Sequence, residues 1–183
     1  MLCCFLAIIS CSFALPVMAK NKAEIVDVKI SRDHGNIAVS FRIEDCFTSK
    51  MEEAIKNGVA TTFRIRVVLE RAGASFFRPQ ILDIVLEHSI KYDRLKNEYR
   101  VKLPEHPDRM SVAHDFEEAK RLMATVKDLP VIPAWRLNKD KGYTLRLKAE
   151  LSKVQLPVFL RYIFFFVSLW DFESDWHNAD FSG

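Results

Sequence analysis

The sequence lacks the motifs that identify most enzymes and cofactor-binding proteins. No catalytic, metal-binding or nucleotide-binding pattern stands out along its 183 residues, so no cofactor is predicted. A formal net charge of +3 is too small to mark a nucleic-acid-binding surface. Internal repeats, low-complexity tracts and an interdomain linker are also absent. The length therefore favours one domain, which is large enough to bury a real hydrophobic core.

Cysteine is scarce beyond the first eleven residues. Cys3, Cys4 and Cys11 lie near the start, and Cys46 is the one cysteine that follows. A single thiol cannot form an internal disulfide or complete a tetrahedral zinc site. Cys46 also has no histidine at a spacing typical of nucleophilic catalysis. Stability must therefore come from packing.

Charge is missing from residues 1–19, which contain a long apolar run. Val17-Met18-Ala19 places small residues where a leader is cleaved, and charge begins at Lys20. The run is too short for an ordinary spanning helix, so it predicts a signal peptide over 1–19 and an exported domain over 20–183. It departs from the usual pattern because no basic residue precedes it. An alternative is a bacterial lipoprotein acylated at Cys11, although the chain stays apolar after that residue.

Apolar and polar residues alternate along most of the remaining chain, which is the pattern of strands with one buried face. Residues 26–30 and 37–43 flank the turn sequence Arg32-Asp33-His34-Gly35-Asn36 and predict a β-hairpin. Further strands are predicted over residues 63–70, 81–92, 99–103 and 143–151. A strand over Val131–Leu137 is expected at a sheet edge, because Pro130 and Pro133 cannot complete a central ladder.

Two short helices are predicted between the strands. The first begins with the capping-box sequence Ser49 to Glu52 and ends before Gly58, with Met51, Ala54 and Ile55 buried. The second begins with an acidic turn at residues 115–118. Its buried face is predicted to comprise Phe116, Ala119, Met123 and Val126, and Glu117 is expected to pair with Arg121.

About seven strands and two short helices predict a mainly β fold. A series of hairpins favours an antiparallel β-sandwich, immunoglobulin-like in its number of strands. The outward positions of the strands carry many cations. If the strands are neighbours they form a basic surface for anionic lipid or an acidic partner; otherwise they are a solvated face, since Glu70, Glu98 and Glu150 are interspersed. The cations are Arg64, Arg66, Arg100, Lys102, Arg146 and Lys148.

The C-terminal segment 156–176 is unusually aromatic, and Arg161 is the one charge between Leu156 and Trp170. Three interpretations remain open. The segment closes the sandwich, enters a bilayer interface as a monotopic contact, or docks a partner protein. Its candidate contact residues are Tyr162, Phe164, Phe165, Phe166, Trp170 and Trp176.

The order of several motifs resembles that of the DUF4390 family of exported bacterial proteins, over about Ile25 to Asp180. The matching pieces are a helix, glycine and strand over 51–65, a strand pair over 89–101, a helix and strand over 116–147, and an ending of Leu156-Pro157 with residues 170–176. The resemblance implies export and supplies no catalytic residue or substrate. Some members are encoded beside sensor kinases, which implies a link to envelope signalling and an association with such a kinase.

His88 interrupts an apolar strand face and is either a core histidine bonded to the backbone or a catalytic base. The loop from His106 to Asp115 also contains Asp108 and His114, which suggests a solvated loop or, as the alternative, a metal site. The prediction is a non-enzymatic envelope protein, periplasmic or peripherally membrane-associated, that binds an envelope protein or the membrane surface. The alternatives are a periplasmic hydrolase using His88 or the His106–Asp115 loop, and a carrier of a small ligand between two sheets.

Overall fold

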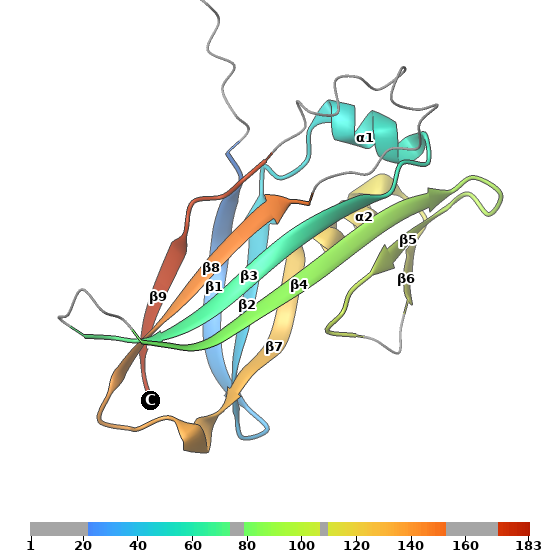
Figure 1. Ribbon diagram of the computed structural model, residues 1–183. Helices are drawn as coiled ribbons and strands as arrows, with labels where there is room; N and C mark the ends of the chain where they lie inside the picture. The colour runs from blue at the N-terminus through green and yellow to red at the C-terminus, as the bar shows by residue number, and fades with distance from the viewer. Residues whose placement is uncertain (1–21, 74–78, 107–109, 153–171) are drawn as a thin grey trace, which may run out of the picture.

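A computed structural model describes residues 22–73, 79–106, 110–152 and 172–183. Nine strands and two α-helices form this part of the chain, and all strand pairs are antiparallel (Figure 1). The strands form a three-stranded sheet, β1-β2-β7, and a six-stranded sheet, β6-β5-β4-β3-β8-β9. The predicted antiparallel β-sandwich is therefore confirmed.

The three-stranded sheet contains β1 (Glu24–Asp33), β2 (Asn36–Glu44) and β7 (Thr125–Pro133). The predicted hairpin is present, and its two-residue turn is His34-Gly35 with φ of 45° and 79°. Positive φ at both positions is the geometry that matches the twist of the flanking strands. Next to this tight turn, β1 and β2 pair without interruption from Asp33 and Asn36 to Lys29 and Ser40.

The face of β1 differs from the prediction at its start. A bulge lies between Val26 and Lys29, where Asp27 has a φ of 53°. The bulge adds a residue and reverses the alternation. Ile25 is consequently buried in place of Val26, while Val28 and Ile30 pack against the core as predicted.

The six-stranded sheet contains β3 (Thr61–Arg71), β4 (Gln80–Asp93), β5 (Glu98–Lys102), β6 (Met110–Ala113), β8 (Gly142–Leu151) and β9 (His177–Ser182). The strands predicted over 63–70, 81–92, 99–103 and 143–151 are all present, and β6 and β9 are additional. In β3, Phe63, Ile65, Val67 and Leu69 are fully buried, as their alternation predicts.

The strand predicted over Val131–Leu137 lies earlier in the chain. β7 ends at Pro133, and a 3-10 turn, η1 (Ala134–Arg136), follows because Leu137 N–H donates to Ala134 O at 3.1 Å. Within the described chain β7 pairs with β2 alone, so it is an edge strand as its prolines predict.

The helices are α1 (Ser49–Lys56) and α2 (Phe116–Met123). The predicted capping box is wrong by one residue, because Thr48 is the N-cap and its hydroxyl accepts from Met51 N–H at 3.2 Å. Gly58 follows the C-cap with a φ of 86°, as predicted. Gly58 N–H donates to Ile55 O and Val59 N–H to Ala54 O, which closes a Schellman motif.

Helix α2 is shorter than predicted. It ends at Met123, and the buried Val126 belongs to β7. Ala124 O accepts from Ile43 N–H at 2.8 Å, so the chain joins the three-stranded sheet there. Glu117 pairs with Lys120 at 2.6 Å and not with the predicted Arg121.

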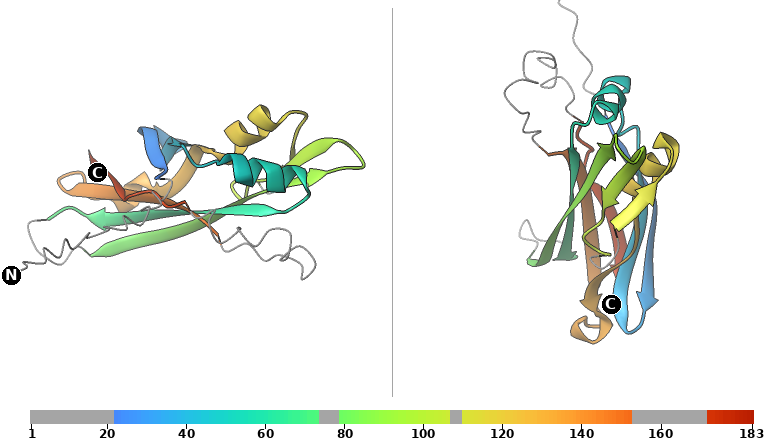
Figure 2. Two further views of the ribbon diagram at one scale, coloured as in Figure 1. Left: turned by 90° about the horizontal axis from the view of Figure 1, so that it is seen from above. Right: turned by 90° about the vertical axis from the view of Figure 1, so that its right-hand side faces the viewer.

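The two sheets pack face to face over one hydrophobic core. β1 contacts β8 and β9 across the interior, while α2 packs on β4, β5 and β6. Figures 1 and 2 show both helices at one end of the molecule. The three-stranded sheet and the helices thus share the inner face of the larger sheet, and the interior buries Phe41, Phe63, Tyr143 and Phe172.

Candidate functional site

His88 lies in the core, on the inner face of β4 opposite Phe63 of β3. Its side chain is 0% exposed. The Nδ1 atom lies 2.9 Å from Met123 O at the end of α2, and the Nε2 atom lies 2.9 Å from Glu105 Oε1. Both ring nitrogens therefore have partners, which is what a buried imidazole requires.

Glu105 is the second member of this pair, and its side chain is only 4% exposed. Burial acts to raise the pKa of Glu105, but the hydrogen bond and charge of His88 outweigh burial and leave the pKa below its usual value of 4.5. The carboxylate is thus held in its ionised form beside the imidazole. The pair connects β4, the loop after β5 and the end of α2.

The geometry of His88 bears on the hydrolase hypothesis. A histidine beside a carboxylate is the arrangement of a general base with its orienting group. In the structure, however, the second ring nitrogen of His88 is bonded to a backbone carbonyl and the side chain has no solvent contact. A substrate cannot reach this imidazole in the conformation described, so the pair acts here as a structural connection.

Strand β6 lies within the predicted His106–Asp115 loop. His106 and His114 are exposed, and Asp108 lies outside the described residues. Asp115 caps α2, since its Oδ1 atom accepts from Glu118 N–H at 2.7 Å. Across the described ranges no three His, Cys, Asp or Glu side chains are placed to hold a metal ion.

Cys46 is buried between β2 and α1. Burial raises the pKa of its thiol to about 12. The Sγ–H group donates to Ile43 O at 3.4 Å. A protonated, buried thiol is a small apolar side chain rather than a nucleophile.

The predicted cations do share the outer face of the six-stranded sheet, because β5, β4, β3 and β8 are neighbours in that order. Most of them are paired with carboxylates on the same face. Arg66 binds Asp83 bidentately, and this hydrogen bond raises the pKa of Arg66 and lowers that of Asp83. The other pairs are Arg64–Glu87 at 3.9 Å, Arg100–Asp93 at 3.0 Å, Arg146–Glu70 at 3.0 Å and Lys148–Glu173. The face is therefore a network of both signs, not a basic field.

Trp176 lies over this network just before β9. Its ring is partly buried against three cationic groups. Arg146 Cζ lies 4.4 Å from the ring centroid, Lys148 Nζ lies 5.7 Å away and Arg66 Cζ 5.9 Å away. Such cation–π contacts fix the indole on the sheet. Trp176 is the one predicted contact residue that the structure describes; Tyr162, Phe164, Phe165, Phe166 and Trp170 lie outside the described residues.

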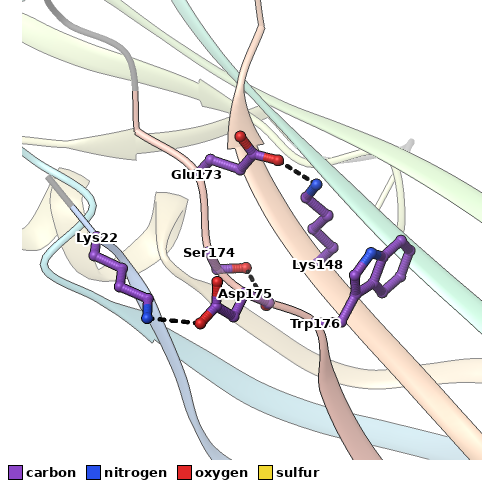
Figure 3. A pocket seen from close by; sticks show the side chains of 6 residues that line it. All are labelled: Lys22, Lys148, Glu173, Ser174, Asp175 and Trp176. Carbon is purple, nitrogen blue, oxygen red and sulfur yellow. Dashed lines mark hydrogen bonds and ion pairs between the residues drawn. The ribbon is translucent and has the colours of Figure 1, made fainter. Parts of the chain in front are cut away.

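A cleft of about 340 Å³ opens where the first described residue, Lys22, meets residues 173–176 and Lys148 of β8 (Figure 3). Lys22, at the start, pairs with Asp175 at 2.6 Å, and this hydrogen bond raises the pKa of Lys22. The Ser174 hydroxyl accepts from Ala149 N–H and donates to Asp175 O. These bonds fix residues 173–176 along the end of β8, with Trp176 and Lys148 on the cleft wall.

The residues that flank the aromatic segment are also fixed at this place. Leu151 N–H donates to Phe172 O at 3.1 Å, and Ser152 N–H donates to Thr62 O at 2.8 Å. Phe172 is fully buried and contacts Phe63 with ring centroids 4.7 Å apart. The residues that flank the aromatic segment in the sequence, 151–152 and 172–175, therefore lie together, and Asp175 pairs with Lys22.

These contacts define an antiparallel β-sandwich protein with a polar cleft at the end where its first described residue and the flanks of its aromatic segment meet. The chain belongs to a family described as a domain of unknown function, DUF4390, whose sequence profile matches residues 20–180. The predicted resemblance is thereby confirmed. No curated protein and no solved structure matches the chain significantly.

Sequence reasoning missed three features. The pairing of His88 with Glu105 joins residues 17 positions apart and leaves no periodic signal. The strand β9 alternates His177, Ala179 and Phe181 with polar residues, but its apolar side chains are too few to stand out. Ser174 gives no signal of its own, since its role depends on the neighbouring β8 backbone.

Proposed function

We propose that this chain is an exported, non-enzymatic envelope protein that attaches to a membrane surface through the end of the sandwich that carries the cleft. One observation carries the proposal. The contact between Lys22 and Asp175 joins the start of the mature chain to the far flank of the aromatic segment. The two most apolar stretches of the sequence, 1–19 and 156–170, are therefore attached to the same end of the molecule.

A bilayer suits this arrangement better than a protein partner. If the leader is retained or acylated at Cys11, one apolar phase can receive both stretches at once. Removal of the leader after Ala19 would leave Lys20 and Lys22 at this end, where basic residues favour anionic headgroups. Aromatic side chains such as Phe164 to Phe166 and Trp170 are those that partition into a bilayer interface.

The free-energy cost of exposing apolar side chains to water indicates that another surface covers the aromatic segment. At about 25 cal/mol per Å² of apolar surface, four large apolar side chains left in water would cost several kcal/mol. Within the described residues no helix is long and apolar enough to cross a membrane. The attachment is proposed to be peripheral because the apolar stretch 156–170 is shorter than the roughly 20 residues of a spanning helix.

The test is flotation of purified residues 20–183 with vesicles of zwitterionic and anionic phospholipid. In the key variant a short Gly/Ser linker replaces residues 154–170, which the Leu151–Phe172 contact allows because the flanks are adjacent. We expect the native chain to float and the variant to stay in solution with an unchanged melting temperature. The matched control is Leu95→Ser, which removes a 99% exposed apolar side chain elsewhere and should float like the native chain.

Two results would contradict the proposal. Failure of the native chain to float would show that the aromatic segment does not bind a bilayer, and a partner protein would then be its ligand. Recovery of the mature protein from the cytoplasm after cell fractionation would show that the protein is not exported. A signalling role beside a sensor kinase is a further part of the proposal, and it requires the envelope location that fractionation tests.

A further inference from the structure

A second surface lies at the opposite end of the sandwich, around Trp135. This residue is in η1, between β7 and β8, and is 82% exposed. An indole buries about 200 Å² when it is covered. An isolated exposed tryptophan therefore has much apolar surface available for binding, and tryptophan is enriched among residues that dominate protein interfaces.

The backbone around Trp135 is fixed rather than loose. Ala134 N–H donates to Gly35 O of the β1–β2 turn at 2.9 Å, and Asn138 N–H donates to the Tyr143 hydroxyl at 2.8 Å. Leu137, two residues on, is buried in the core. The indole is thus presented outward on an ordered support, which lowers the entropy lost when a partner covers it.

Exposed cations follow Trp135 closely in the chain. Arg136, Lys139 and Lys141 are all exposed, and none has a side-chain ion pair or hydrogen bond in the part of the chain that the structure describes. The cations on the outer face of the six-stranded sheet differ from these three, because Arg66 and Arg146 form ion pairs with carboxylates. Between Ala134 and Lys141 the one carboxylate is Asp140, so the segment has a net charge of +2 from three cations and one anion.

The Trp135 end of the sandwich lies too far from the cleft end to contact the bilayer proposed above. β8 runs from Gly142, which follows the Trp135 turn in the chain, to Leu151, which is bonded to Phe172. Ten residues of strand span about 30 Å at 3.3 Å per residue. A membrane that meets the cleft end therefore does not reach Trp135, and Figure 1 shows η1 and the β1–β2 turn together at the far end.

We propose that the Trp135 surface, defined as Trp135, Arg136, Lys139 and Lys141, docks a protein that presents carboxylates around an apolar pocket of indole size. Unpaired cations attract and orient such a partner, and the buried indole supplies the contact area. A lipid surface fits less well, since a single aromatic residue gives weak insertion and the length of β8 holds this end about 30 Å from the proposed membrane contact. This inference goes beyond the proposed membrane attachment and concerns the end that faces away from it.

The test is photocrosslinking in cells that export the full chain. The photoreactive amino acid p-benzoylphenylalanine replaces Trp135, which keeps an aromatic group there, and replaces Lys91 on the outer sheet face as a background control. We expect a discrete protein adduct from position 135 alone, with the crosslinked peptide, sequenced by mass spectrometry, flanked by Asp and Glu. Adding R136Q, K139Q and K141Q should lower its yield about tenfold, whereas the matched variant R64Q, K102Q and K127Q should leave it unchanged.

Other outcomes overturn the inference. These are an adduct with phospholipid, an adduct whose peptide lacks carboxylates, no adduct, or equal labelling from positions 135 and 91. Thermal melts of each variant distinguish loss of binding from loss of folding. Since flotation tests the opposite end of the molecule, either proposal can fail while the other stands.

Discussion

At the scale of single residues, the pair of His88 and Glu105 explains how a polar residue is accommodated on an apolar strand face. Each group satisfies the other, and Met123 O satisfies the remaining ring nitrogen. Removing one member of a buried pair leaves an uncompensated polar group, whereas removing both can be nearly neutral.

Substitution of His88 by leucine should therefore lower the free energy of unfolding by about 3 kcal/mol, because Glu105 would remain buried without a partner. The double variant H88L/E105L should lose less than H88L alone. Urea denaturation of the native protein, both single variants and the double variant measures this. If the double variant lost the sum of the single losses, the pair would not be coupled.

Glu105 also predicts a pH dependence. Its pKa is lowered on folding, from the usual 4.5. Such a group stabilises the folded state above its unfolded pKa, and the stabilisation is lost as pH falls through the lower folded pKa. The difference in unfolding free energy between native protein and E105Q should therefore be largest near neutral pH and shrink below 4.5. Parallel profiles for the two proteins across that range would show that Glu105 makes no such contribution.

At the scale of elements, each helix and strand depends on a few local signals and on its neighbours. Helix α1 ends where Gly58 adopts a φ of 86°, which an L side chain rarely adopts. Gly58→Ala should therefore destabilise the protein by about 1 kcal/mol. Gly73→Ala is the control, because Gly73 has no positive φ and nothing lies within 4 Å of an added Cβ. Equal melting temperatures for the two variants would contradict this account of the helix end.

The same local signals explain which elements could be predicted. Period-2 alternation is strong in β3, β4 and β8 because each has one buried and one wet face, and their inward residues were correctly predicted. The four residues of β6 are too few to show a period. The bulge at Asp27 and the end of α2 at Met123 depend on pairing with β2, which is a tertiary contact.

The candidate site was less predictable than the fold for a related reason. Alternation predicts the charges on outward positions, but their neutralisation depends on the register that brings Arg64 opposite Glu87 and Arg66 near Asp83. Likewise Lys22 and Asp175 are far apart in sequence, and they meet where β1 of one sheet packs against β8 and β9 of the other. Exposure of Trp135 could not be foreseen, since the sequence around it alternates like a strand.

At the scale of the whole molecule, the sandwich has two ends with different chemistry. One end joins Lys22, the cleft and the flanks of the aromatic segment, and the other presents Trp135 among unpaired cations. We propose that the cleft end binds a membrane and that the Trp135 end binds an acidic protein. The sandwich is thus proposed to be oriented with its cleft end toward the membrane and its Trp135 end away from it.

The three tryptophans of the chain test that orientation directly, because Trp135 lies at the far end, Trp176 on the sheet and Trp170 in the aromatic segment. Variants that keep one tryptophan and change the others to Phe are bound to vesicles whose phospholipid tails carry bromine, a short-range quencher. The account predicts strong quenching of Trp170, weaker quenching of Trp176 and none of Trp135. Quenching of Trp135 with Trp170 unaffected would contradict it.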